Sequence, residues 1–161
     1  MDIHLKSRTN IIHTFPAFAG LLLALLTFAA TATASSNSDG SYFIDGYDVV
    51  SYFTHDAPKM GSTRYKTEYH GQTMLFINNE NLTTFLANPE AHMPAYNGNC
   101  AYGMAFGMKS RADPLQYAII DNRLYMQLDR GTNQRWLQRF NTYIQRSDMA
   151  WSRLTVSNND F

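Results

Sequence analysis

The sequence predicts an α+β domain in which a small antiparallel sheet of two hairpins packs with several short helices and a C-terminal amphipathic helix. Two pairs of β-favouring runs are each separated by a short polar turn, and segments of helical periodicity follow them. The strand–helix–strand alternation of a parallel sheet is absent from the pattern. The chain carries 13 basic and 13 acidic side chains without runs of one sign, so a nucleic-acid partner is not expected.

The first 34 residues have the pattern of a secretory signal peptide. Lys6 and Arg8 give a positive start, residues 17–26 are apolar, and Ala32-Thr33-Ala34 is a small-residue cleavage pattern. The apolar run is shorter than the roughly 20 residues that span a bilayer, so we expect no stable membrane span after cleavage. The mature protein would be periplasmic or secreted.

Cleavage after Ala34 leaves 127 of the 161 residues, with a net charge near −1. That length fits one domain. We expect a signal peptide at 1–34, a flexible Ser/Asn/Gly-rich leader at 35–41, a single domain at 42–154 and a tail at 155–161.

In the first part of the domain, Asp45 or Asp48 is expected to cap a short helix that continues to Phe53, followed by a loop. Strands are expected at 63–69 and 73–77, joined across His70-Gly71-Gln72, where Gly71 can adopt the positive φ of a tight turn. A helix should follow from Asn78 to Asn88. Its apolar face would carry Leu82, Phe85 and Leu86.

In the second part, Asn99 is expected to cap a helix that begins at Cys100 and reaches Met108. Asp113-Pro114 indicates a turn, and a second hairpin should pair 117–120 with 124–128. The last predicted element is one amphipathic helix over 132–149. Its inward side chains would be Trp136, Phe140, Tyr143 and Ile144. No internal repeat is visible in the sequence.

Cys100 is the only cysteine, so the chain cannot form an intrachain disulfide. At the start of a helix its sulfur would lie near unsatisfied N–H groups, which favour the reactive thiolate. The residue also fits a small buried hydrophobe beside Ala101, Ala105 and Phe106. Cys100 is therefore a candidate redox thiol; no other catalytic residue is assigned, and no motif indicates an enzyme.

A soft metal site is a second candidate role for Cys100. On the expected helix, Cys100, Met104 and Met108 would share one face, and His92 and Met93 precede them by a short loop. Thiolate, thioether and imidazole ligands suit Cu(I), although methionines at helical spacing are more often core residues. The candidate metal ligands are Cys100, His92, Met93 and Met104, with copper or another soft metal ion as the candidate cofactor.

A series of short motifs runs through the mature chain. They are Gly46-Tyr47-Asp48-Val49-Val50-Ser51-Tyr52-Phe53, Asn81, Phe85-Leu86-Ala87-Asn88-Pro89-Glu90, Tyr96, Gly98, Cys100-Ala101-Tyr102-Gly103, Asp113-Pro114, Ile119-Ile120-Asp121, Leu124-Tyr125, Trp136 and Trp151. In this order and spacing they resemble the exported YHS-domain family, sometimes labelled YHS-domain (seleno)proteins. The resemblance implies a small α+β domain. Some relatives carry selenocysteine, which implies redox chemistry for the residue at position 100.

Two departures from the family pattern bear on function. Asn97 and Asn99 interrupt the Tyr-Gly-Gly-aromatic segment that usually precedes the cysteine. Metal-handling relatives have cysteines where this chain has Ile77 and Asn81, so the resemblance implies that their thiolate site is not retained.

Two functions follow from the sequence. The first is an exported accessory protein with a redox-responsive or soft-metal-binding thiol at Cys100. The second is a thiol-inert module whose aromatic face binds another envelope protein or a small ligand. Burial of Cys100 with no polar neighbour would favour the second function.

Overall fold

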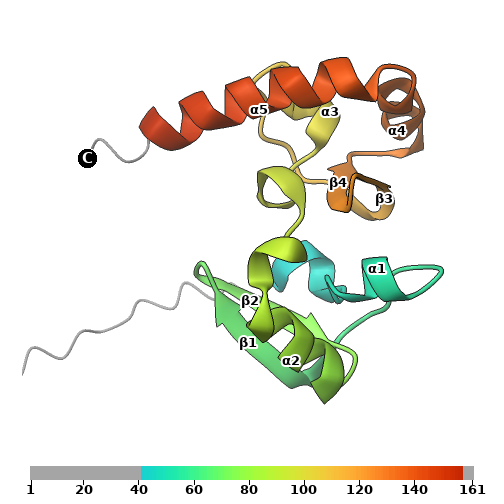
Figure 1. Ribbon diagram of the computed structural model, residues 1–161, viewed down its shortest axis with the longest axis vertical. Helices are drawn as coiled ribbons and strands as arrows, with labels where there is room; N and C mark the ends of the chain where they lie inside the picture. The colour runs from blue at the N-terminus through green and yellow to red at the C-terminus, as the bar shows by residue number, and fades with distance from the viewer. Residues whose placement is uncertain (1–40, 158–161) are drawn as a thin grey trace, which may run out of the picture. The chain divides into compact units, whose positions relative to one another are not determined.

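The computed structural model describes residues 41–157, which form a mixed α+β domain (Figure 1). This part of the chain contains two separate antiparallel hairpins, five α-helices and three short 3₁₀ helices (η). The α+β class is confirmed, with each hairpin forming its own two-stranded sheet. In chain order the elements are η1 (Phe43–Gly46), α1 (Ser51–Thr54), β1 (Ser62–Tyr69), β2 (Gln72–Phe76), α2 (Asn79–Ala87), η2 (Pro89–Ala91), η3 (Ala95–Gly98), α3 (Ala101–Met104), β3 (Asp113–Ile120), β4 (Arg123–Gln127), α4 (Arg130–Leu137) and α5 (Phe140–Ser157).

The predicted signal peptide and all but the last residue of the predicted leader lie outside the described residues. Within residues 41–157, none of the helices combines the length and the apolar character needed to cross a bilayer.

Each hairpin reverses direction through two residues with left-handed backbone. The φ angles are 49° at His70 and 73° at Gly71, and 50° at Asp121 and 58° at Asn122. Turns of this handedness match the twist of the flanking strands, and Gly, Asn and Asp tolerate them best. Each turn thus has two residues, one fewer than the three-residue connections expected at 70–72 and 121–123.

An irregularity in strand pairing interrupts both hairpins at the same point. The register shifts between Ser62 and Lys66 in β1, and between Asp113 and Tyr117 in β3. Asp113-Pro114 was expected to form a turn but instead begins β3. Pro114 precedes the regular pairing that starts at Tyr117, so its missing N–H costs no ladder hydrogen bond there.

Two similar halves, residues 43–88 and 95–139, precede α5 in the domain, and the sequence pattern did not reveal them. Three elements of the first half recur 51 residues later, namely β1 as β3 (Ser62 to Asp113), β2 as β4 (Gln72 to Arg123) and α2 as α4 (Asn79 to Arg130). The helix caps recur as well. Asn78 Oδ1 accepts a hydrogen bond from Asn81 N at 2.8 Å, and Asp129 Oδ1 accepts one from Thr132 N at 2.7 Å.

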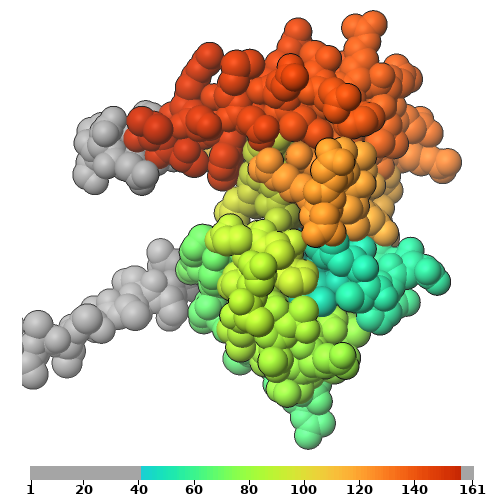
Figure 2. All heavy atoms as spheres, viewed as in Figure 1, coloured from blue at the N-terminus to red at the C-terminus, as the bar shows by residue number. Residues whose placement is uncertain are grey.

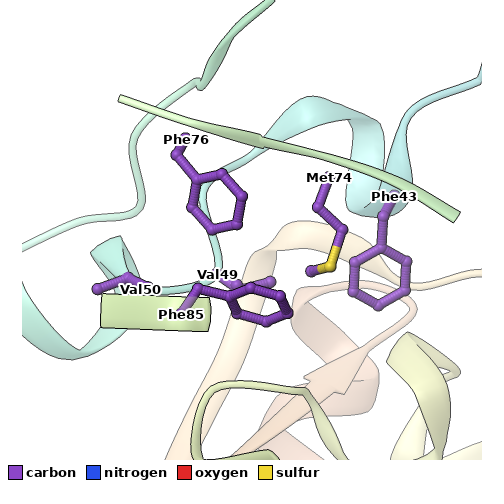
Figure 3. Close-up of a cluster of buried hydrophobic side chains, with 6 residues drawn as sticks. All are labelled: Phe43, Val49, Val50, Met74, Phe76 and Phe85. Atoms are coloured by element: carbon purple, nitrogen blue, oxygen red, sulfur yellow. The ribbon is translucent and has the colours of Figure 1, made fainter. Parts of the chain in front are cut away.

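The buried core of the first half is built from η1, the two residues before α1, β2 and α2. Its members are Phe43, Val49, Val50, Met74, Phe76 and Phe85. Figure 3 shows Phe76 and Phe85 facing each other within this cluster, and their ring centroids lie 5.2 Å apart. Leu86 is 57% exposed, so the apolar face of α2 is narrower than expected and centres on Phe85.

The core of the second half centres on Trp136, whose side chain is fully buried. Phe140, Tyr143 and Ile144 pack against its cluster, as expected. The single helix expected over 132–149 is wrong, however, because α4 ends at Leu137 and α5 begins at Phe140. Arg139 N donates to Trp136 O, which closes α4 as Asn88 N closes α2, and α5 then packs along α3 (Figure 1).

A third cluster joins the two halves and contains Tyr52, Ala112, Leu124 and Met126. Tyr52 belongs to α1, and its hydroxyl donates to the Pro114 carbonyl of β3 at 2.9 Å. Burial raises the pKa of the Tyr52 phenol, so this hydroxyl keeps its proton and the hydrogen bond.

Candidate functional site

Helix α3 is shorter than the sequence indicated, and Cys100 itself occupies its N-cap position. Asn99, the expected cap, instead donates from Nδ2 to the Tyr96 carbonyl at 2.8 Å. Met108 lies beyond the helix and is 58% exposed, so the expected stripe of three sulfur atoms reduces to Cys100 and Met104. A helix of four residues has little dipole of its own. The environment of the thiol is therefore set by individual hydrogen bonds.

Cys100 Sγ has three polar neighbours. It accepts hydrogen bonds from the backbone N–H groups of Gly103 at 3.5 Å and Leu128 at 3.3 Å. As a thiol it donates to Gln127 Oε1 at 3.6 Å. The residue is only 1% exposed. Cys100 is thus buried like a core residue. Its sulfur atom nevertheless contacts three polar groups, which burial alone does not require.

The corresponding position in the first half holds Asp48, which is fully buried. Asp48 Oδ1 accepts from Val50 N at 2.8 Å and from Ser51 N at 3.3 Å. Its Oδ2 accepts from Ile77 N at 2.9 Å and from Asn81 Nδ2 at 2.7 Å. Four donors therefore converge on the two oxygen atoms of this side chain.

Cys100 and Asp48 occupy equivalent places in the two halves. Each follows a 3₁₀ turn with left-handed residues, η3 or η1, and precedes a short helix. The Asp48 N–H donates to Lys59 O and the Cys100 N–H to Ser110 O, both at 2.9 Å. The N–H donors also correspond, because Gly103 and Leu128 stand where Ser51 and Ile77 stand. The sulfur atom therefore takes two of the N–H groups that bind a carboxylate in the other half.

The third backbone donor shows how the second half differs. Tyr102 N, the counterpart of Val50 N, donates to Gln127 Oε1 at 3.1 Å rather than to Cys100. A single sulfur atom replaces two carboxylate oxygens, so a second acceptor is needed for this N–H. Gln127 supplies it at the place where the first half has the buried Phe76. Its Nε2 has no hydrogen-bond partner among the described residues.

The sulfur atom both accepts and donates in this arrangement. Two backbone N–H groups donate to it, and the Gln127 carbonyl accepts its S–H. With an exposure of 1%, the sulfur is accessible only to small reagents or after local opening.

The other candidate metal ligands divide between the halves. Met104 is buried in the second-half cluster with Ala101, next to Cys100 along α3. Met93 packs against the first-half cluster. The His92 ring packs edge-on against Phe53, and its Nδ1 lies 3.0 Å from Asn88 O. Among residues 41–157, no group of three or more His, Cys, Asp and Glu side chains is placed to hold a metal ion.

The sequence indicated that Cys100 lies at the start of a helix. It did not indicate that Asp48 is the counterpart of Cys100 in the first half, or that Gln127 is a neighbour of its sulfur atom. Asp48 was expected to be a candidate helix cap and part of a family motif, not a buried polar centre. Gln127 gives a weak signal, as one polar residue directly after the apolar run Leu124-Tyr125-Met126 in a predicted strand. No protein-family model, no curated protein and no solved structure matches the chain.

Proposed function

We propose that the chain is an exported accessory protein, of the type its motifs resemble, whose Cys100 thiol responds to redox change. One observation carries the proposal. Cys100 Sγ accepts two backbone N–H groups whose counterparts in the first half bind the Asp48 carboxylate. The backbone geometry that holds a buried carboxylate in one half thus offers two N–H donors to the sulfur atom in the other. The signal-peptide pattern ending at Ala34 supports release into the periplasm or outside the cell.

The reaction we propose is oxidation of the thiolate by a small hydroperoxide. Sγ attacks the terminal oxygen, the O–O bond breaks, and the leaving oxygen takes a proton: RS⁻ + R′OOH + H⁺ → RSOH + R′OH. Because the chain has one cysteine, no intrachain disulfide follows. When local opening exposes the sulfur, the sulfenic acid condenses with an external thiol and releases water, which gives a mixed disulfide or a covalent dimer.

The test compares a small oxidant with a bulky alkylating agent. Folded protein is treated with dilute hydrogen peroxide or with N-ethylmaleimide, quenched and unfolded, and its remaining thiol is counted. We expect peroxide to consume the thiol while the maleimide reacts only after unfolding, because Cys100 is 1% exposed. A thiol that survives peroxide until the protein unfolds would make Cys100 a core residue.

Gln127→Glu provides a matched perturbation, because it keeps the acceptor for Tyr102 N and adds a negative charge beside the sulfur. Like charges at such distances disfavour the thiolate, so oxidation at pH 7 should slow by about 10-fold or more. Gln134→Glu, an exposed change on α4, is the control and should leave the rate unchanged. Equal rates for both variants would contradict the proposed role of the thiolate.

Soft-metal binding stays a prediction for the same thiol. Cys100 and Met104 are both buried on α3, and they are the two candidate ligands that belong to one half. If Cu(I) binds them, it should protect Cys100 from alkylation, and Met104→Leu should weaken that protection.

The alternative function is a binding module with an inert thiol. A separate feature favours it, namely a pocket lined by residues of both hairpin turns.

A further inference from the structure

A pocket of about 490 Å³ opens on the domain, and Cys100 is not among the residues that line it. Its volume lies within the roughly 300–1,000 Å³ range of small-molecule sites. Both hairpin turns contribute to its wall, through His70 in the first half and through Asn122 and Arg123 in the second. The segment at 90–97 and Trp151 of α5 complete it. Figure 2 shows the surface recessed between the green part of the domain and the red helix α5.

The acidic group of the pocket is Glu90. Its Oε1 accepts a hydrogen bond from the Tyr69 hydroxyl, and the side chain is exposed. The ion pairs between described residues are Arg111 with Asp45 and Arg123 with Asp148. Within that part of the chain, the Glu90 carboxylate therefore has a neutral hydrogen-bond donor but no cation, and it can accept an ammonium group.

The basic group of the pocket is Arg123. Its guanidinium lies 5.5 Å from the ring centroid of Tyr96 and 5.4 Å from that of Tyr125, so it is held over two aromatic faces. It contacts Asp148 once, at 3.5 Å. Asp148 also accepts a hydrogen bond from the Tyr96 hydroxyl at 2.9 Å. Since a guanidinium has five N–H donors, Arg123 can bind a second carboxylate while keeping this contact.

The wall of the pocket also contains apolar and aromatic side chains. Met93, Pro94 and Trp151 line it, and Trp151 packs edge-on against Tyr96 with centroids 6.1 Å apart. Tyr96 is only 2% exposed, and both Trp151 and Arg123 pack against its ring. The pocket thus combines one acceptor for a cation, one donor for an anion and an apolar surface.

We propose that this pocket binds a small zwitterion with an apolar side group, namely an amino acid or a short peptide with free termini. The ammonium pairs with Glu90, the carboxylate with Arg123, and the apolar group packs against Trp151 and Met93. The proposal does not rest on the reactivity of Cys100.

The probe is the dipeptide alanyl-phenylalanine, titrated into the reduced protein while Trp fluorescence and calorimetric heat are recorded. Trp151 lines the pocket and Trp136 is fully buried elsewhere, so a ligand should alter the signal of Trp151. The N-acetyl derivative lacks the ammonium, the C-terminal amide lacks the carboxylate, and each should bind about 5-fold or more weakly. Free phenylalanine distinguishes a single amino acid from a peptide.

Protein variants give the matching arm. Glu90→Gln should weaken binding of the dipeptide but leave binding of its N-acetyl derivative unchanged. Arg123→Gln should weaken binding of the dipeptide but leave binding of its C-terminal amide unchanged. Glu80→Gln and Arg130→Gln are exposed controls outside the pocket and should bind as the wild type does. The proposal is overturned if neither phenylalanine nor the dipeptide binds at about 10 mM, a concentration at which even weak sites fill. It is also overturned if the blocked derivatives bind as well as the zwitterion.

Discussion

Replacing Cys100 by Asp should convert the sulfur site of the second half into the carboxylate site of the first half. The change adds a buried charge, which ordinarily destabilises a protein severely. Here the N–H groups of Gly103 and Leu128 already point at the side chain. A third N–H, that of Tyr102, is held by Gln127 and would have to be released. The informative comparison is therefore a cycle of Cys100→Asp, Gln127→Leu and the double variant.

The expected coupling energy between the two substitutions follows from the hydrogen bonds. Gln127→Leu alone leaves the Tyr102 N–H without its acceptor, at a cost of about 1–3 kcal/mol. Cys100→Asp alone places a carboxylate against the Gln127 carbonyl. In the double variant that carbonyl is gone, and Tyr102 N can donate to the new carboxylate as Val50 N donates to Asp48 at 2.8 Å. The double variant should thus be more stable than the sum of the single changes predicts, by about 1–3 kcal/mol.

Urea unfolding of the four proteins, followed by circular dichroism, measures this coupling. Gln134→Leu, an exposed change on α4, serves as the control partner for Cys100→Asp and should show no coupling. Additivity within about 0.5 kcal/mol for Gln127→Leu would refute the equivalence of the two sites. The Cys100 sulfur would then not stand in for a carboxylate.

Trp136→Ala should lower the free energy of unfolding by about 3–5 kcal/mol, because the indole is fully buried. Leu137→Ala, at a side chain that is 45% exposed, is the matched control, and equal urea midpoints for both would contradict this packing. A second expectation concerns alkaline pH, because burial and then the hydrogen bond to Asp148 raise the pKa of Tyr96 above its ordinary 10.0. The folded state keeps this proton longer than the unfolded state, so its contribution is complete below pH 10.0 and is lost as the pH rises toward the folded pKa. Tyr96→Phe should make stability fall less steeply above pH 10.0 than the exposed change Tyr42→Phe does, and identical slopes would contradict the assignment.

The hairpins and the cap of α2 could be predicted because their signals are local. Thr and Tyr enrichment marks β1, Gly71 marks its turn, and Asn78 precedes the helix that it caps. The break between α4 and α5 could not be predicted, because neither Gly nor Pro stands there. At the break, the Arg139 N–H donates to Trp136 O, three residues back in the chain.

The repeat and the thiol site escaped prediction for a related reason. The halves share backbone conformation rather than side chains: Asp48 corresponds to Cys100, Phe76 to Gln127 and Phe85 to Trp136. Gln127 lies 27 positions from Cys100 and reaches it only through the pairing of the second hairpin. The pocket likewise collects residues from both hairpin turns and α5, which no local pattern brings together.

Because each sheet has two strands, no strand in the described part of the chain has a second strand on its outer side; an isolated bridge to Cys100 pairs only Met126 of β4. On β1, the exposed charges of Arg64, Lys66 and Glu68 oppose the addition of a further strand. No charged residue follows Asp113 on β3, where Leu115 is 55% and Ile119 36% exposed. Pro114 and the adjacent bulge are what interrupt this edge. Strand β3 is thus where aggregation of concentrated protein would begin, and Pro114 is the residue that opposes it.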